Sequence, residues 1–162
     1  MPDVKKNKSI LDTFMLFVQT SRIVAKYTDA FLYRQAHLSP VKLIVLKALD
    51  KSNGTMTPSE IAKWTQTERH NITTLVRRMI KDGLITAERS KTNRKFVNVT
   101  ITDTGRKVLA ETLPIAQEAV DRVMASISDS SASEMAKNLQ VMKQNSDDAF
   151  NEITGHAEKI AS

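Results

Sequence analysis

The sequence contains no cysteine, which excludes a disulfide framework, thiolate zinc sites and any thiol that acts in catalysis or redox sensing. It has 4 glycines and 4 prolines, and aromatic residues make up 5% of it. This scarcity argues against a turn-rich sandwich or barrel and favours a mostly helical protein. No apolar run reaches about 18 residues, the length that a membrane-spanning helix needs. We therefore expect no membrane-spanning segment, and the lack of cysteine suits a cytoplasmic protein.

The 162 residues are 41% hydrophobic and 26% charged, a composition typical of one globular domain, alone or with an oligomerisation arm. Their net charge of +6 is unevenly distributed. Residues 39–107 hold 14 Lys and Arg against 6 Asp and Glu, whereas residues 1–38 hold 6 against 3 and residues 108–162 hold 4 against 9. The charge pattern thus predicts a basic central module with an acidic partner such as nucleic acid.

Two helices are predicted in the first third of the chain. From Ser9 to Tyr33, apolar residues recur at steps of three and four without Gly or Pro, which predicts a long helix. Ser39-Pro40 combines a side chain able to accept from free amides with a Pro suited to the first helical position. A second helix is therefore expected from Pro40 to Leu49, ended by the turn at Asn53-Gly54.

The next segment has the pattern of a helix-turn-helix. A capping box at residues 57–60, Thr-Pro-Ser-Glu, predicts a short helix from Pro58 to about Trp64. A second box at residues 65–68, Thr-Gln-Thr-Glu, would open the following helix, and Gly83 would end it in the left-handed conformation. The expected core stripe of this helix is Ile72, Leu75, Val76, Met79 and Ile80.

The hydrophobic period changes from helical to alternating after Gly83. Residues 84–89 and 96–101 therefore predict two strands, joined by a loop at 90–95 that has three positive charges and no negative one. A helix-turn-helix followed by such a hairpin is a winged helix. The expected fold class is mainly α with a small β-hairpin wing.

Two further helices are expected after the hairpin, one capped at Thr102-Asp103 and reaching Ile127, the other opened by a capping box at residues 131–134. Together with the first helix they carry more apolar surface than the basic module can cover. We therefore expect a homodimer, with residues 1–38 and 108–162 forming the dimerisation region and residues 39–107 the winged helix.

The fourth predicted helix has the residues of a DNA recognition helix. Side chains in its first two turns would face base edges in the major groove, and basic side chains further along would lie near phosphates. Asn71 is the best base-reading candidate, because an amide can pair with both N6 and N7 of adenine. The candidate contacts are Arg69, His70, Asn71, Thr73, Thr74, Arg77 and Arg78 in the helix and Lys91, Arg94 and Lys95 in the loop.

Plainer interpretations of these residues remain open. The helix could be an ordinary amphipathic helix with a solvated basic face, and Asn71 could be a local cap or turn amide.

Neither catalysis nor metal binding has support in the sequence. His37, His70 and His156 are far apart and do not have metal-ligand spacing, although carboxylates could complete a site. Ser39 and Lys42 match a Ser-x-x-Lys motif formally, but the accompanying motifs of that enzyme class are missing. No phosphate-binding loop, nucleophile elbow or dinucleotide fingerprint occurs. We expect no enzyme, no cofactor and no metal.

Beyond these patterns, the sequence resembles the MarR family of winged-helix transcription regulators over nearly the whole chain. The family's strand-to-helix pattern, Asp-x-Arg, three residues, Val-x-Leu-Thr-x-x-Gly, is met at Val99, Thr102 and Gly105. Ile101 replaces Leu, Asn93 replaces Asp and Lys95 replaces Arg. The matching segments are Ile61-Ala62, Asn71-Ile72-Thr73-Thr74-Leu75-Val76-Arg77-Arg78-Met79, Asp82-Gly83-Leu84-Ile85 and Val99-Thr100-Ile101-Thr102-Asp103-Thr104-Gly105.

The resemblance implies a sequence-specific regulator of transcription that binds double-stranded DNA, with repression relieved by a small aromatic or phenolic effector. A dimer would meet an operator with inverted half-sites. Phe14, Tyr27, Phe31 and Tyr33 could line an effector crevice where the first two helices meet the fifth, or they could simply be core and dimer packing. The alternative function is a winged-helix module that binds protein or RNA.

Overall fold

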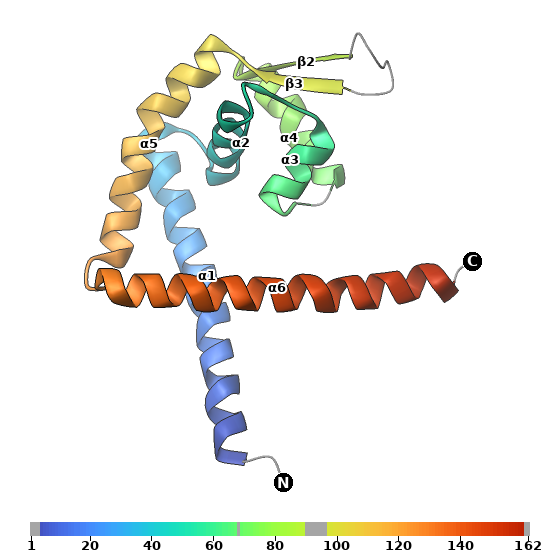
Figure 1. Ribbon diagram of the computed structural model, residues 1–162. Coiled ribbons are helices and arrows are strands. Elements are labelled where there is room, and N and C mark those ends of the chain that lie inside the picture. Colours follow the sequence, from blue (N-terminus) through green and yellow to red (C-terminus); the bar gives the residue numbers. More distant parts are fainter. Residues whose placement is uncertain (1–3, 68, 90–96, 161–162) are drawn as a thin grey trace. The chain divides into compact units, whose positions relative to one another are not determined.

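The computed structural model describes residues 4–67, 69–89 and 97–160, with the backbone alone for 4–8, 69, 70 and 155–160. Contacts divide the chain into two compact units, Met1–Val123 and Met124–Ser162. The elements in these ranges are α1 (Val4–Ala36), α2 (Pro40–Lys51), β1 (Thr55–Met56), α3 (Pro58–Thr65), α4 (Arg69–Lys81), β2 (Ile85–Arg89), β3 (Val97–Ile101), α5 (Asp103–Met124) and α6 (Asp129–Ile160) (Figure 1). The predicted fold class, mainly helical with a small β-wing, is confirmed.

The hydrophobic core lies in the first unit, between α2, α3, α4 and the sheet. Its side chains come from the apolar stripes that the sequence predicts, and several have no exposed surface at all. Leu32 of α1 and Leu109 of α5 extend the core towards the flanking helices. The largest fully buried side chains are Leu32, Leu46, Leu49, Ile61, Ile72, Met79, Ile85, Val45 and Val99.

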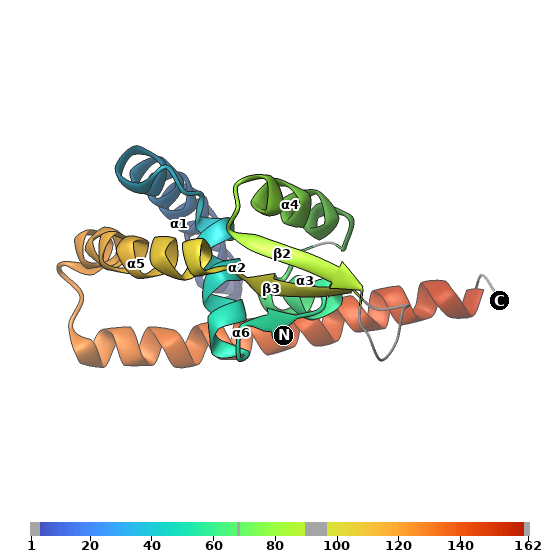
Figure 2. The same cartoon turned by 90° about the horizontal axis from the view of Figure 1, so that it is seen from above.

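The sheet is antiparallel, with β3 between β1 and β2, and α4 contacts β2 (Figure 2). The two predicted strands are confirmed; the first begins one residue later than predicted, and Phe96, the predicted first residue of the second, lies outside the described residues. The two-residue β1 is not predicted, because a strand this short has no periodicity to detect. It pairs Thr55 with Thr100, whose hydroxyl groups are 3.0 Å apart.

The predicted cap of α3 is confirmed, whereas the predicted side-chain cap of α2 is wrong. The Thr57 backbone N–H donates to Glu60 Oε2 at 2.7 Å, and the Glu60 N–H donates to Thr57 Oγ1 at 3.3 Å, which completes a capping box. Ser39 precedes α2, but its hydroxyl forms no cap hydrogen bond. There the helix start relies on Pro40, whose missing N–H removes one of the amides that a cap would satisfy.

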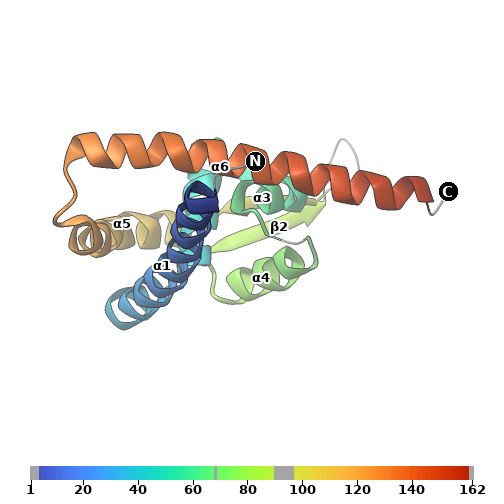
Figure 3. The same cartoon turned by 90° about the horizontal axis from the view of Figure 1, so that it is seen from below.

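The predicted capping box at Thr65 is wrong, because Thr65 is the last residue of α3. Its hydroxyl donates to the Ile61 carbonyl at 2.9 Å, one turn back, so it is not available to cap the next helix. Gln66 then takes a left-handed conformation with φ of 52°, and α4 begins at Arg69 (Figure 3). Glu68, the fourth residue of the predicted box, lies outside the described residues.

The end of the hairpin is joined tightly to α5 by Thr102. Its hydroxyl donates to the Gly83 carbonyl at 2.7 Å and accepts from the Gly105 N–H at 3.0 Å, which confirms Thr102 as a cap of α5. A Cβ on Gly105 would lie 2.1 Å from the Leu84 carbonyl oxygen. Glycine is therefore the residue that lets α5 start against the turn after α4, which gives a physical reason for the Thr-x-x-Gly pattern.

The last two helices begin or end elsewhere than predicted. α5 ends at Met124, short of Ile127. α6 begins at Asp129, because Ser128 Oγ accepts from the Ser131 N–H at 3.2 Å and so caps this helix ahead of the predicted box at 131–134. The assignment of residues 1–38 and 108–162 to dimerisation stays a prediction.

Candidate nucleic-acid interface

One face of α4 is buried and the other carries polar and basic side chains. Ile72, Val76 and Met79 are buried, as the sequence predicts, and Leu75 packs against them at the edge of the core. Ile80 is 42% exposed, so its predicted place in the core stripe is wrong. At about 100° per residue, Ile80 lies about 40° beyond Val76, at the edge of the stripe, where the core does not cover it.

The exposed face of α4 holds the candidate DNA contacts whose side chains the structure describes: Asn71, Thr73, Thr74, Arg77 and Arg78. The helical period places Thr74, Arg77 and Lys81 roughly opposite the buried stripe and Asn71 near its edge. Thr74 and Arg77 therefore point most directly at a surface placed against this face. For Arg69 and His70 the structure describes only the backbone, as the first two residues of α4.

Three basic side chains of α4, Arg77, Arg78 and Lys81, have no acidic partner in the described part of the chain. Among the described residues, neither Arg77, Arg78 nor Lys81 forms an ion pair. All three are exposed, so their positive charge is free to attract phosphates.

Two acidic side chains of the first unit are paired with basic residues outside α4. Asp82, directly after α4, accepts from Lys42 Nζ of α2 at 2.6 Å. Asp50 of α2 accepts from Arg106 Nη1 of α5 at 2.7 Å. The first of these pairs joins the C-terminal end of α4 to the start of α2, a contact that sequence reasoning missed because 40 residues separate its partners.

The strands β2 and β3 lie in the same module as α4. They pair antiparallel, from Ile85 opposite Ile101 to Arg89 opposite Val97. The candidate contacts Lys91, Arg94 and Lys95 belong to residues 90–96, outside the described part of the chain. Their part in DNA binding stays a prediction from the sequence.

The structure does not bring the four candidate effector residues together. Tyr27 and Phe31 stack one turn apart with ring centroids 5.7 Å apart, and Arg122 of α5 lies 5.3 Å over the Phe31 ring. Phe14 pairs with Phe17 further along α1, and Tyr33 meets His37 at the other end. Phe14 and Tyr33 are 50% and 67% exposed.

A pocket of about 410 Å³ does lie where α1 meets α2, but none of those four aromatic residues lines it. Ala25, Thr28 and Asp29 of α1 form one wall, and Ser39, Pro40 and Val41 at the start of α2 form the other. Sequence reasoning missed these residues, because small and polar side chains between two helices have no distinctive spacing.

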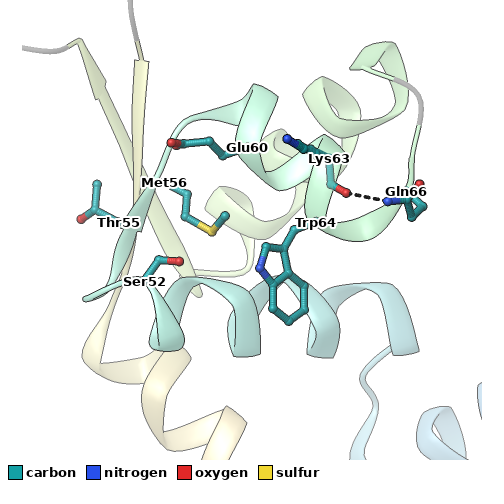
Figure 4. Close-up of a pocket in the computed structure, with 7 residues that line it drawn as sticks. All are labelled: Ser52, Thr55, Met56, Glu60, Lys63, Trp64 and Gln66. Atoms are coloured by element: carbon teal, nitrogen blue, oxygen red, sulfur yellow. Dashed lines mark hydrogen bonds between the residues drawn. The ribbon is translucent and has the colours of Figure 1, made fainter. Parts of the chain in front are cut away.

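A larger pocket, of about 550 Å³, lies on the winged helix beside α3 (Figure 4). It is lined by Ser52, Thr55 and Met56 and by four residues of α3 and its C-terminal turn: Glu60, Lys63, Trp64 and Gln66. Within the described ranges, no group of three acidic or histidine side chains is placed to hold a metal ion. None of the helices described is long and apolar enough to cross a membrane.

A family model matches the central module of the chain. Residues 38–95 match the model of the MarR family. This match covers most of the winged helix, so the module is similar to the winged helix of MarR-family proteins. Proteins of this family are DNA-binding regulators of transcription and are not enzymes. No curated protein matches the sequence.

Solved structures of MarR-family and related regulators share the fold. Sco3205 of Streptomyces coelicolor, in complex with DNA, is 20% identical with a TM-score of 0.78, over 82% of this chain and 84% of Sco3205. A mutant MarR from E. coli, complexed with operator DNA, is 13% identical with a TM-score of 0.74, over 83% of this chain and 95% of that one. The regulator RdhR-CbdbA1625, bound to 2,4-dichlorophenol, is 22% identical with a TM-score of 0.76, over 90% and 86%.

Proposed function

We propose that this chain is a cytoplasmic, dimeric repressor that binds an inverted-repeat operator through α4 and leaves it when a small aromatic effector binds. The observation that carries the proposal is the exposed face of α4, where Arg77 and Arg78 lie beside Asn71 and Thr74 without an acidic partner in the described residues. Unpaired cations supply sequence-independent attraction to phosphates, and the amide and hydroxyl groups can read base edges.

Exposed apolar side chains on the long helices support the dimer. An isolated chain would leave these in water, and a second copy would bury them. On α1 they are Ile10, Leu11, Phe14, Met15, Leu16, Phe17 and Ile23. On α6 they are Met135, Leu139, Val141, Phe150 and Ile153.

Selection of bound duplexes from genomic fragments tests the DNA-binding part of the proposal. Two identical recognition helices related by a dimer axis must meet equivalent segments of the major groove, so the selected sites should hold inverted half-sites centred about 10–11 base pairs apart. Affinity for the selected palindrome should exceed that for random duplex at every salt concentration, and both should fall as salt rises. Selected sites without inverted symmetry would contradict the dimeric mode of reading.

The same assay separates the alternative function. A winged helix that binds RNA or protein would show equal, weak affinity for the palindrome and for random duplex.

The proposal that a small aromatic effector releases the operator rests on the likeness to a regulator solved with 2,4-dichlorophenol and on the pocket between α1 and α2. Phenols that lower operator affinity in the wild-type chain would support it, and their failure would leave DNA reading intact.

A further inference from the structure

Asp82 places a negative charge at the end of the helix that is proposed to bind DNA. Its N–H donates to the Arg78 carbonyl at 3.0 Å, and the next two N–H groups donate to carbonyls of the last turn of α4 at 2.9 and 3.0 Å. With Gly83 in the left-handed conformation at φ of 72°, these bonds form a Schellman motif whose C-cap is Asp82. A carboxylate is unfavourable there, because the carbonyl end of the helix dipole is also negative.

Arg78 is the basic residue of α4 that this carboxylate could reach. Residues four apart on a helix lie on the same side, whereas adjacent residues do not face each other. Asp82 continues the helical hydrogen bonding, so Arg78 lies one turn before it on the same edge of the helix, and Asn71 lies two turns further back. Yet Arg78 is exposed and forms no ion pair within the part of the chain that the structure describes.

Lys42 pairs with Asp82 instead. Its Nζ lies 2.6 Å from Asp82 Oδ2, and its side chain is 22% exposed against 41% for that of Asp82. Lys42 lies in the first turn of α2, where the helix dipole disfavours a cation, so neither charge is favoured by its own helix. The pair offsets both unfavourable charges. With the carboxylate bound by Lys42, the guanidinium of Arg78 stays free on the exposed face of α4.

We propose that Lys42 is a positioning residue for DNA binding, which binds the Asp82 carboxylate and so keeps the Arg78 guanidinium available to a phosphate. The inference rests on the proposed binding of DNA by α4. Lys42 acts through Asp82 and Arg78, and its own ammonium contacts no DNA in this arrangement. Without Lys42, Asp82 pairs with Arg78, and DNA has to break that pair before a phosphate can bind the guanidinium.

A double-mutant cycle on the full chain tests the coupling between Lys42 and Arg78. Fluorescence anisotropy with a labelled random duplex at constant salt measures the affinity. Lys47→Gln is the matched control, because it removes the same charge from an exposed position of the same helix. Lys42→Gln should weaken binding about twofold more than Lys47→Gln does, which is the effect of one ion pair between residues four apart on a helix. In an Arg78→Gln background, the two lysine substitutions should have equal effects.

A second measurement follows Arg78 in the free protein, without DNA. The side-chain Nε–H resonance of Arg78, assigned by its absence in Arg78→Gln, reports on the guanidinium directly. Lys42→Gln should shift this resonance, because Asp82 then pairs with Arg78. The further substitution Asp82→Asn should return the resonance to its wild-type position, because it removes the carboxylate and leaves the net charge equal to that of the wild type.

The outcomes separate this inference from its alternatives. Equal effects of Lys42→Gln and Lys47→Gln on duplex affinity, or an unshifted Arg78 resonance, would overturn it. A penalty of Lys42→Gln that persists in the Arg78→Gln background would assign the ion pair to holding α4 on the core, and would also overturn it. A wild-type chain without affinity for any duplex would refute the proposed function and the role of Lys42 in it, whereas the Arg78 resonance would still decide whether Lys42 keeps Asp82 and Arg78 apart.

Discussion

Asn71 is an exposed amide in the first turn of α4, next to the buried Ile72 that fixes the helix on the core. Replacing Asn71 with Ala should cost about 1–3 kcal/mol on the preferred operator and much less on random duplex, because an amide that pairs with a base edge discriminates between bases. Titrations against the operator and its single-base variants measure this. An Asn71→Ala protein with unchanged base preference would assign Asn71 to packing or capping.

Arg94 is expected to contact the DNA backbone or the minor groove and not to discriminate between bases. It lies outside the described residues, so this prediction rests on its charge and its place in the basic loop. Arg94→Ala should weaken binding to operator and random duplex alike and flatten the log–log salt dependence by about one unit if one phosphate contact is lost. Because Lys95 stands where the family has Arg, we expect a looser wing and a smaller effect on the best operator than for Asn71. Altered base preference in Arg94→Ala would reverse the two roles.

At the scale of the element, the capping box of α3 makes stability depend on pH. The hydrogen bonds from the backbone and then the side chain of Thr57 lower the pKa of Glu60. A carboxyl with a lowered pKa stabilises the fold fully above its unfolded pKa, about 4.3, and loses that contribution as the pH falls. Glu60→Gln should therefore lower the melting temperature slightly at pH 7 and leave it closer to wild type at pH 3.

The control for this experiment is Glu88→Gln, which removes an exposed carboxylate from β2. Its effect on the melting temperature should not follow the same pH dependence. Identical pH profiles for the two variants would assign the effect to net charge and not to the cap.

Hydrophobic periodicity and capping residues predicted the helices and strands but not the contacts between them. Ile72 and Met79 could be predicted as core because burial follows the helical period. Thr65 could not be placed, since a threonine can bond forwards as a cap or backwards to a carbonyl with the same sequence around it. The exposed face of α4 followed from its sequence, whereas the pocket beside Trp64 did not. It depends on β1 and α2 reaching the side of α3, which local patterns do not encode.

At the scale of the whole molecule, dimerisation through the long helices predicts what happens when part of them is removed. Deleting residues 131–162 should weaken or abolish the dimer, because it removes most of the exposed apolar side chains of α6. Sedimentation at micromolar concentration measures the change. A full-length chain that already sediments as a monomer would remove the premise.

A point substitution tests the same premise without truncation. Val141 is 59% exposed on α6, so Val141→Asp should shift the equilibrium towards monomer. Its exposed neighbour Gln140, replaced by Asp, should leave the dimer unchanged if that face is not in the interface. Equal effects of the two variants would point to charge on α6 as the cause.

The contact at Gly105 also determines which second mutations could repair a damaged chain. Gly105→Ala should destabilise the protein by about 1–3 kcal/mol, as overpacking does, measured by chemical denaturation. Its obstacle is the main-chain carbonyl of Leu84, which every residue type carries, so exchanging the side chain at position 84 cannot remove it. At Gly54 the nearest obstacle is the Arg106 guanidinium, which a smaller side chain would remove. A search for intragenic suppressors of Gly105→Ala should therefore find none at position 84. In a Gly54→Ala protein, by contrast, a smaller side chain at position 106 should relieve the steric clash.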